Sequence, residues 1–378
     1  MVQRERLLAE FMELVQVDSE TRHEAEISRV LKEKFGALGL EVTEDDTAAK
    51  TGHGSGNLFA WLPASPGLEN VPALLFTCHM DTVSPGKGIK PRLDEDGYIR
   101  SDGTTILGSD DKAGLAAMLE SIRVLQEKKL PHGPIQFVIT AGEEAGLIGS
   151  RAMDGSKLKA KYGYALDSNG EVGSIAVAAP TNSRQYITFI GKAAHAGVNP
   201  EDGINALQAA AKAVARMPLG RIDLETTANV GRIEGGGETN IVPERVTVYA
   251  EARSHDPAKM DQVVQQMREV AESAAREVGA QVEFVSEVLY PAYRFGDGDE
   301  VVEIAKAAIR AIGLEPRLFA SGGGSDANMF NGNGVPTVNL AVGYEDIHTV
   351  NERIKADDLV KVTELVLAIV AETVKRSA

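Results

Sequence analysis

One short stretch near the middle of the chain does most to restrict the fold. Residues 135–140 read Ile-Gln-Phe-Val-Ile-Thr, a run of β-branched and aromatic types that is typical of a buried strand. Glycines at 142 and 146 predict a turn after it, and two adjacent carboxylates, Glu143 and Glu144, lie in that turn. Open α/β sheets hold their ligand sites beyond the carboxyl ends of the strands. We therefore take both glutamates as candidate site residues, although most Glu-Glu pairs are solvated surface.

Other apolar runs lead into acidic residues or histidines in the same way. Residues 73–77, 162–166 and 335–342 are strand-like, and a pair of aspartates precedes a helix with an apolar face from residue 115 onward. The candidate side chains at these places are His79, Asp81, Asp110, Asp167 and His348.

Each of these candidates also has an ordinary structural explanation. An isolated His-x-Asp is commonly a buried histidine with a satisfied hydrogen bond, and an aspartate before a helix is commonly a cap. Asp167 precedes Ser-Asn-Gly and suits a turn. However, His79 and Asp81 point the same way on an extended chain, so one can bind a metal while the other orients its ring. Five candidates follow strand ends in chain order and favour one shared site, with Glu143 and Asp81 beside them: His79, Asp110, Glu144, Asp167 and His348.

Three further features are predicted to serve structure. Lys112 can neutralise Asp111 and leave Asp110 to project elsewhere. Cys78 has oxygen-rich neighbours and is interpreted as a small core residue; as the one cysteine of the chain, it excludes an intrachain disulfide. Residues 21–24 read Thr-Arg-His-Glu, which has the form of a capping box and predicts a helix start.

The charge balance restricts the partners. The chain has 378 residues and a formal net charge of −16, which argues against nucleic acid or an anionic membrane as the main partner. No run of about 18 apolar residues is present, and the N-terminus leads directly into an amphipathic helix pattern without an apolar signal core. We therefore expect a soluble, cytoplasmic protein.

The sequence pattern changes between about residues 181 and 290. The order there is strand–helix–strand–strand–helix–strand, which is ferredoxin-like. We expect residues 1–180 to form the first part of a catalytic domain, 181–290 an inserted domain, and 291–378 the second part. Three polar residues of the inserted domain fall near strand ends or loops, namely His195, Asn240 and Arg253.

A glycine triplet follows later, within Ser-Gly-Gly-Gly-Ser-Asp at 321–326. Its backbone amides can approach an anionic group closely, which makes Gly323 and Gly324 candidate substrate-binding residues. A flexible turn is the alternative.

The collected residues have the composition of a two-metal site. Two histidines and three carboxylates suit two zinc-like ions at about four ligands each if one carboxylate bridges. Ions held about 3.5–4 Å apart lower the pKa of a shared water and supply hydroxide at neutral pH. Glu143, next to a ligand but free itself, can take that proton and pass it to a leaving amine. The residues thus point to metal-assisted amide hydrolysis.

The same motifs resemble a known family. They are His-Met-Asp at 79–81, Gly-Ser-Asp-Asp-Lys at 108–112, Gly-Glu-Glu at 142–144, the strand end at Asp167, Ala-His-Ala-Gly at 194–197 and Ile-His at 347–348. Together they look like the co-catalytic zinc peptidase family of peptidase T, carboxypeptidase G, aminoacylase and succinyl-diaminopimelate desuccinylase. The likeness covers nearly the whole chain. Residues 107–114 are especially similar to the tripeptide aminopeptidase (peptidase T) branch.

The resemblance implies an α/β fold and a metal assignment. The catalytic domain would be a mixed sheet flanked by helices, with an inserted ferredoxin-like α+β lid and dimerisation domain. Each subunit would hold two Zn²⁺ ions, with Co²⁺ or Mn²⁺ as possible substitutes. His79 and Asp167 would hold one ion, Glu144 and His348 the other, and Asp110 would bridge them.

Further roles follow from the resemblance alone. A cis peptide would join Asp110 to Asp111, Asp81 would orient His79, and Glu143 would be the general base. His195 would stabilise the tetrahedral oxyanion, in its own subunit or in the partner's site.

The resemblance also implies how substrate and partner bind. Asn240 and Arg253 match positions that contact substrate, with Arg253 a candidate for a free carboxylate. The two domains would close over a short peptide, and the inserted domain would form a homodimer.

Four functions remain open at this point. The first is a dizinc aminopeptidase of tripeptidase (peptidase T-like) type that acts on short peptides. The second is an N-acyl-amino-acid deacylase or carboxypeptidase with the same chemistry. The third is a non-catalytic peptide-binding module, which is disfavoured because Glu143 and all five ligand candidates are present. The fourth is a two-metal phosphoesterase, which is disfavoured because the sequence has no basic cluster for a phosphate.

Overall fold

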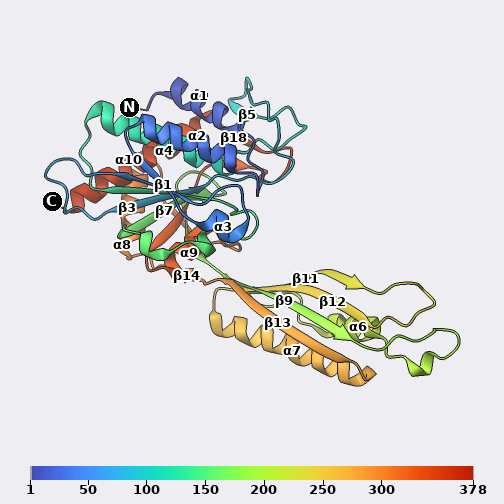
Figure 1. The fold of residues 1–378 in the computed structure, drawn as a ribbon. Helices are drawn as coiled ribbons and strands as arrows, with labels where there is room; N and C mark the ends of the chain where they lie inside the picture. The colour runs from blue at the N-terminus through green and yellow to red at the C-terminus, as the bar shows by residue number, and fades with distance from the viewer. Residues whose placement is uncertain (1, 378) are drawn as a thin grey trace. The chain divides into compact units, whose positions relative to one another are not determined.

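The computed structural model describes residues 2–377 and divides the chain into two compact units (Figure 1). The first unit comprises the residues up to 178, residues 295–321 and the residues from 325 onward. The second comprises residues 179–294 together with the glycine triplet at 322–324. Among residues 2–377, no helix combines the length and the apolar character that crossing a membrane requires.

The first unit is built on a mixed sheet, as expected. Its strands run in the order β1-β2-β6-β3-β7-β16-β8, and β15 pairs with β8. The neighbours β6, β3, β7 and β16 are mutually parallel, whereas β1, β2 and β8 pair antiparallel to their neighbours on this path. The bounds are β1 Glu41–Glu44, β2 Leu58–Leu62, β3 Leu74–His79, β6 Ile135–Thr140, β7 Tyr162–Ser168, β8 Ser174–Ala179, β15 Arg317–Ala320 and β16 Thr337–Ala341.

Two apolar cores cover the two faces of this sheet, because successive side chains of a strand point to opposite sides. The larger core joins Phe76, Phe137 and Tyr164 to the long helices. The smaller core joins Leu75 and Val138 to Phe330 of a short helix and to Met153, which directly follows another. The long helices are α1 Arg4–Val15, α2 Ala25–Ala37, α4 Ser109–Lys128, α8 Glu300–Ala311 and α10 Ala356–Ser377; the short ones are α3 Thr47–Thr51, α5 Ile148–Ala152 and α9 Asp326–Gly332.

A second, small sheet of the first unit has no counterpart in the sequence pattern. Its strands run in the order β17-β18-β5-β4 and are two or three residues long. It ties a C-terminal segment to residues just before α4, since Arg353 pairs with Arg100. The bounds are β4 Arg92–Leu93, β5 Tyr98–Arg100, β17 Tyr344–Glu345 and β18 Arg353–Lys355.

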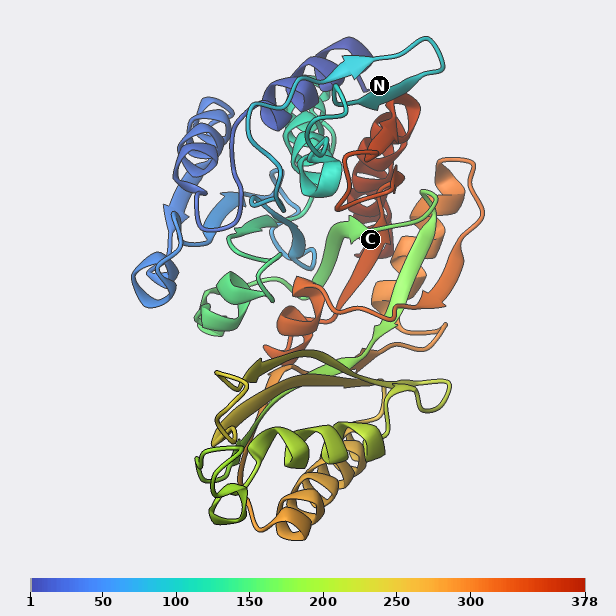
Figure 2. The same ribbon diagram turned by 90° about the vertical axis from the view of Figure 1, so that its right-hand side faces the viewer.

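The second unit has the ferredoxin-like order of elements. Its sheet runs β10-β11-β12-β9-β13, and two helices pack on one face of it, through alternate residues such as Ile187, Phe189, Val246 and Val248 (Figure 2). The bounds are β9 Thr181–Ile190, α6 Ala206–Arg216, β10 Gly220–Arg221, β11 Thr226–Gly235, β12 Arg245–Ser254, α7 Pro257–Val278, β13 Gln281–Tyr290 and β14 Tyr293–Arg294.

One local prediction is wrong. Residues 21–24 do not form a capping box: α2 begins at Ala25, and Glu24 occupies the N-cap position without a side-chain cap hydrogen bond. Tertiary partners use these side chains instead. The Thr21 hydroxyl donates to Asp81 Oδ2 at 2.7 Å, and the Glu24 carboxylate contacts His53 Nδ1 at 2.8 Å. Beside one local bond from the Arg22 N–H to Glu24, long-range hydrogen bonds hold these side chains.

Candidate metal centre

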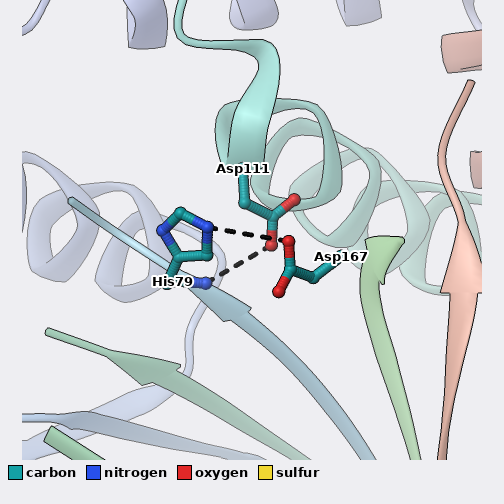
Figure 3. Close-up of side chains that lie close together, drawn as sticks. All are labelled: His79, Asp111 and Asp167. Carbon is teal, nitrogen blue, oxygen red and sulfur yellow. Dashed lines mark hydrogen bonds and ion pairs between the residues drawn. The ribbon is translucent and has the colours of Figure 1, made fainter. Parts of the chain in front are cut away.

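The ends of three neighbouring parallel strands place the first site residues. His79 is the last residue of β3 and is in register with Thr140, the last residue of β6, while Asp167 lies near the end of β7. Figure 3 shows the His79 and Asp167 side chains turned toward one another, with Asp111 beside them. The Nε2 atom of His79 lies 3.6 Å from Asp167 Oδ1.

Asp110 lies between the two candidate histidines. Its Oδ1 is 2.9 Å from His79 Nε2, and its Oδ2 is 3.2 Å from His348 Nε2. His348 Nε2 is also 2.8 Å from Glu144 Oε1. The contacts thus form two groups, one around His79 and one around His348, and Asp110 belongs to both.

The backbone at the start of α4 allows this position. Asp110 and Asp111 have non-helical dihedral angles, and the peptide bond between them is cis, as expected from the family resemblance. Asp111 accepts hydrogen bonds from the His79 and Gly114 backbone N–H groups, each at 3.3 Å. The Lys112 ammonium donates to Ser19 Oγ at 2.8 Å, and the charge of Asp111 acts on it without a direct hydrogen bond between the two side chains. Burial lowers the pKa of Lys112 to about 8.

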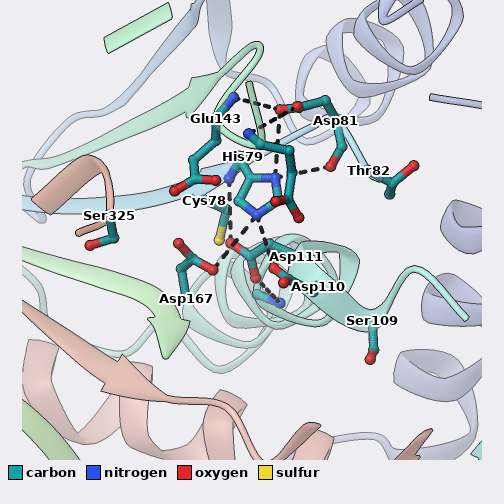
Figure 4. Close-up of polar contacts among 12 residues, drawn as sticks. Cys78, His79, Asp81, Thr82, Ser109, Asp110, Asp111, Glu143, Asp167 and Ser325 are labelled. Carbon is teal, nitrogen blue, oxygen red and sulfur yellow. Dashed lines mark hydrogen bonds and ion pairs between the residues drawn. The ribbon is translucent and has the colours of Figure 1, made fainter. Parts of the chain in front are cut away.

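Asp81 connects His79 to the turn after β6. Its Oδ1 accepts from the Glu143 N–H at 2.9 Å, and its Oδ2 accepts from the Glu144 N–H at 3.3 Å (Figure 4). The ring of His79 contacts Asp81 mainly through the main chain: Nδ1 is 2.9 Å from the Asp81 carbonyl oxygen and 3.6 Å from Oδ1. A proton on Nδ1 that is donated to this carbonyl leaves Nε2 as the ligand atom.

The turn that carries Glu143 depends on a glycine. Gly142 has a φ of 67°, and a Cβ there would lie 2.4 Å from the ring of His53. Glycine is the residue that meets both conditions. The carboxylate of Glu143 consequently points toward His79 and Asp167 (Figure 4).

The electrostatics are those of crowded buried acids. Burial and the charge of Asp167 raise the pKa of Glu143 well above its usual range. Burial also raises the pKa of Asp167 to about 7. Burial opposes ionisation of Asp110 as well, but hydrogen bonds with His348 and His79 outweigh it and hold the pKa of Asp110 below its usual range. Hydrogen bonds with Asp110 and Glu144 raise the pKa of His348 to about 10.

The donor set fits divalent metal ions. Two triplets of donor atoms lie within 4.8 Å of one another: His79 with Asp111 and Asp167, and His79 with Asp110 and Glu144. Imidazole nitrogens together with carboxylate oxygens suit zinc, manganese or cobalt. A dication among these side chains would also relieve the repulsion that raises the carboxyl pKa values.

The second unit holds the other predicted residues. His195 is exposed, and its Nδ1 accepts from the Gly197 N–H at 3.1 Å. Asn240 is next to it, because the Asn240 carbonyl oxygen accepts from the Ala196 N–H at 2.9 Å. Arg253 lies near the end of β12, and its Nε and Nη2 contact the Glu251 carboxylate at 3.0 and 3.3 Å.

The glycine triplet lies beside Arg253 in this unit. A Cβ at Gly323 would be 3.8 Å from Arg253 Nη1, whereas a Cβ at Gly324 would be 2.3 Å from the ring of Tyr290. Gly324 is therefore required for the close approach of this ring.

Three supporting residues were missed in the sequence. The sequence pattern indicates a cap at Thr21 and predicts no role for Asp326 or Glu352. Asp326 is buried and accepts from the Thr140 and Ser150 hydroxyls, which fixes the chain around the Glu143 turn. Glu352 is buried against the segment that carries Asp110. The one sequence signal for Glu352 is its position four residues after His348.

Comparison with known proteins identifies the family. Residues 75–372 match the family described as peptidase family M20/M25/M40. The chain belongs to this peptidase family. It is therefore a hydrolase, and the resemblance to zinc peptidases in the sequence is confirmed at the level of the family.

Three similar proteins show the branch of the M20 family. The aminopeptidase PepT from Bacillus cereus ATCC 10987 is 59% identical with a TM-score of 0.91, covering 98% of this chain and 99% of that one. A tripeptidase from Staphylococcus aureus subsp. aureus Mu50 is 47% identical with a TM-score of 0.94, covering 99% and 100%. The YqjE protein of Bacillus subtilis (strain 168) is 57% identical over 375 residues, covering 99% and 100%. The M20 peptidase is thus similar to peptidase T-type enzymes, as its motifs indicate.

Proposed function

We propose that this M20 peptidase is a dizinc aminopeptidase that releases the N-terminal residue of short peptides, with tripeptides as the preferred class. The observation that carries the proposal is the position of Asp110, whose two carboxylate oxygens face His79 and His348 at 2.9 and 3.2 Å. A carboxylate between two histidines is the arrangement that a two-metal hydrolase needs. The likeness to an aminopeptidase and a tripeptidase at 59% and 47% identity supports the substrate class.

The contacts support one assignment of ligands. His79 and Asp167 would hold one ion, His348 and Glu144 would hold the other, and Asp110, which faces both histidines, would be shared between them. When bound, two such ions supply Lewis acidity that polarises a carbonyl and lowers the pKa of water. Zinc is the proposed metal, with Co²⁺ or Mn²⁺ as substitutes.

Glu143 is the proposed general base. Burial raises the pKa of its carboxyl, which makes the carboxylate a stronger base. The carboxylate accepts a proton from the attacking water as the oxygen of that water forms a bond to the scissile carbonyl carbon. The same proton then passes to the nitrogen of the leaving amine as the C–N bond breaks.

The second unit supplies the proposed substrate contacts. Because Nδ1 of His195 accepts from the Gly197 N–H, the neutral ring carries its proton on Nε2, where it can donate to an oxyanion. Arg253 binds the free carboxylate of the peptide together with the amides of Gly323 and Gly324, while Glu251 holds the guanidinium in place. Asn240 is a further substrate contact.

The proposal includes a homodimer formed through the second unit. The outer strand β13 supports it, since Val285 and Val288 on that strand are 58% and 61% exposed. Sedimentation of the purified protein measures its mass directly. The cytoplasmic location expected from the sequence stays a prediction.

Release of free amino acid from matched substrates tests the activity. A tripeptide, a dipeptide and an N-acetyl amino acid are each incubated with the zinc-loaded enzyme, with chelator, and with Glu143→Gln. Cleavage of the tripeptide that chelator and the substitution abolish is the expected result. Turnover of the N-acetyl substrate alone would place the enzyme with deacylases, release of the C-terminal residue would indicate a carboxypeptidase, and no turnover by a zinc-loaded protein would indicate a binding module.

A further inference from the structure

We propose that Glu352 is a positioning residue of the metal centre: its one carboxylate sets the place of Asp110 relative to His348, and it is needed for tight binding of the ion on the His348 side. The inference rests on the proposed two-metal site. Glu352 itself contacts neither candidate histidine; it acts through the two chain segments that carry the ligands.

The carboxylate of Glu352 holds four consecutive residues at the start of α4. Its Oε2 accepts from the Leu107 and Gly108 N–H groups, both at 2.8 Å. Its Oε1 accepts from the Ser109 hydroxyl at 2.6 Å and from the Asp110 N–H at 3.0 Å. The residue is 2% exposed, so its hydrogen bonds are made with this segment and not with bulk water. The segment before the bridging ligand is therefore fixed to Glu352.

Glu352 is equally fixed to the His348 segment. Its own N–H donates to the Thr349 carbonyl oxygen at 3.2 Å, which closes a turn directly after the histidine. Arg353 then begins β18 and pairs with Arg100 of β5. Asp346 and His348 have φ values of 54° and 64°, in the left-handed region that non-glycine residues adopt only when their surroundings require it. The anchor at Glu352 supplies such surroundings.

The geometry of the ligands explains why the anchor at Glu352 affects the metal centre. Asp110 Oδ2 must stay within reach of both His348 and Glu144, and the contact to His348 is 3.2 Å. Asp110 and His348 are far apart in sequence, and Glu352 joins them through its side chain and through the turn that follows His348. On the other side, His79 and Asp167 lie at the ends of the adjacent strands β3 and β7, so the main sheet itself sets their separation. Glu352 is thus expected to affect the two sides unequally.

Both oxygens of the Glu352 side chain serve as acceptors for backbone N–H groups. An amide at this position would present an NH₂ group to at least one backbone N–H, and two donors cannot bond to one another. Glu352→Gln therefore displaces the 107–110 segment with little change in side-chain volume.

The test measures zinc binding directly, by competition with a chromophoric chelator, and compares Glu352→Gln with wild type. We expect one of the two zinc ions to bind about 10- to 100-fold more weakly, as is usual when a group that supports a ligand is lost, and the other to bind within about threefold of wild type. Peptide cleavage at limiting zinc falls in parallel and recovers when zinc is in excess.

Glu120→Gln is the matched control. Glu120 is a fully buried carboxylate of the same helix, α4, and it accepts from the Gln3 N–H at 3.0 Å and pairs with Arg6 at 2.7 Å. Its substitution lowers the thermal midpoint and leaves both zinc affinities unchanged. If Glu352→Gln does not fold, Ser109→Ala is measured in its place; it removes one of the four donors and is expected to weaken the same ion about 2- to 10-fold.

Two outcomes overturn the inference: wild-type affinity for both ions in the substituted protein, or an equal loss at both. Failure of the proposed function is separate, because it shows as a wild-type protein that binds two zinc ions and cleaves no peptide. In that case the selective loss of one ion would still establish the role of Glu352.

Discussion

The two sides of the candidate metal centre are built in different ways. His79 is 2% exposed and ends a strand whose neighbours on both sides are parallel, so the main sheet holds it in place. The His348 side chain is 48% exposed and lies on a turn between two-residue β17 and three-residue β18. One side is rigid because of sheet geometry, while the other depends on a few long-range hydrogen bonds. We therefore expect the second side to be the one that mutations, pH and chelators affect first.

The largest effect should come from the one ligand that both sides share. Asp110→Ala removes an oxygen from each group, and we expect kcat for peptide cleavage to fall about 10³-fold, because Lewis-acid stabilisation of the transition state is worth several kcal/mol. Both zinc affinities should fall together. Asp102→Ala, at an exposed aspartate of the loop before α4, is the control and should change neither. Loss of a single ion in Asp110→Ala would show that this residue does not bridge.

Removal of each histidine tests the comparison itself. In the metal-free protein, His79→Ala leaves a cavity at the end of β3 and should lower the free energy of unfolding by about 2–4 kcal/mol. His348→Ala removes a half-exposed side chain that pairs with Asp110 and Glu144, and the lost charged hydrogen bonds should cost about 1–2 kcal/mol. Urea unfolding with excess chelator measures both. Equal losses would mean that the two sides are equally integral to the fold.

Proton release on metal binding should differ with pH. The pKa of His348 is raised to about 10 and that of Asp167 to about 7, so binding of zinc must displace a proton from His348 throughout the neutral range and one from Asp167 only below about pH 7. Zinc affinity should thus rise with pH, and more steeply below pH 7 than above it. Calorimetry in buffers of different ionisation enthalpy counts the protons. The same count at pH 6 and pH 8 would contradict the assignment of Asp167 as a ligand.

The smallest expected effect on catalysis comes from removing the hydrogen bond between Thr21 and Asp81. Thr21→Val removes the 2.7 Å hydrogen bond to Asp81 Oδ2, and Asp81 holds the backbone of the Glu143 turn. We expect kcat to fall about 2- to 10-fold, in line with the loss of one hydrogen bond, with both zinc affinities retained. Thr104→Val, at an exposed threonine whose hydroxyl donates to Asp102 at 2.5 Å, provides the comparison on the surface. An unchanged kcat would show that Asp81 holds the backbone of the Glu143 turn without the hydrogen bond from Thr21.

The same difference explains what the sequence could predict. The strands that hold His79, Asp167 and the glutamate turn are continuous apolar runs, so their ends could be found from composition and periodicity alone. The surroundings of His348 rest on β4, β5, β17 and β18, which are too short to show any period. The prediction of a helix cap at Thr21 fails because its hydroxyl donates to a distant carboxylate, Asp81, and not to the local backbone of the helix. The contacts of Glu352 could not be predicted, since its partners lie more than 240 residues away in the sequence.

The order of strands in the main sheet has a consequence for folding during synthesis. Strand β16 lies between β7 and β8, yet it follows the entire second unit in the chain. During synthesis, domains tend to fold from the N-terminus as the chain emerges from the ribosome. When residue 300 has emerged, His79, Asp110, Glu144 and Asp167 are all present, but an interior strand of the sheet and His348 are still missing. A nascent chain of this length is therefore unable to assemble the complete metal centre. We expect peptidase activity to arise only when synthesis is nearly finished.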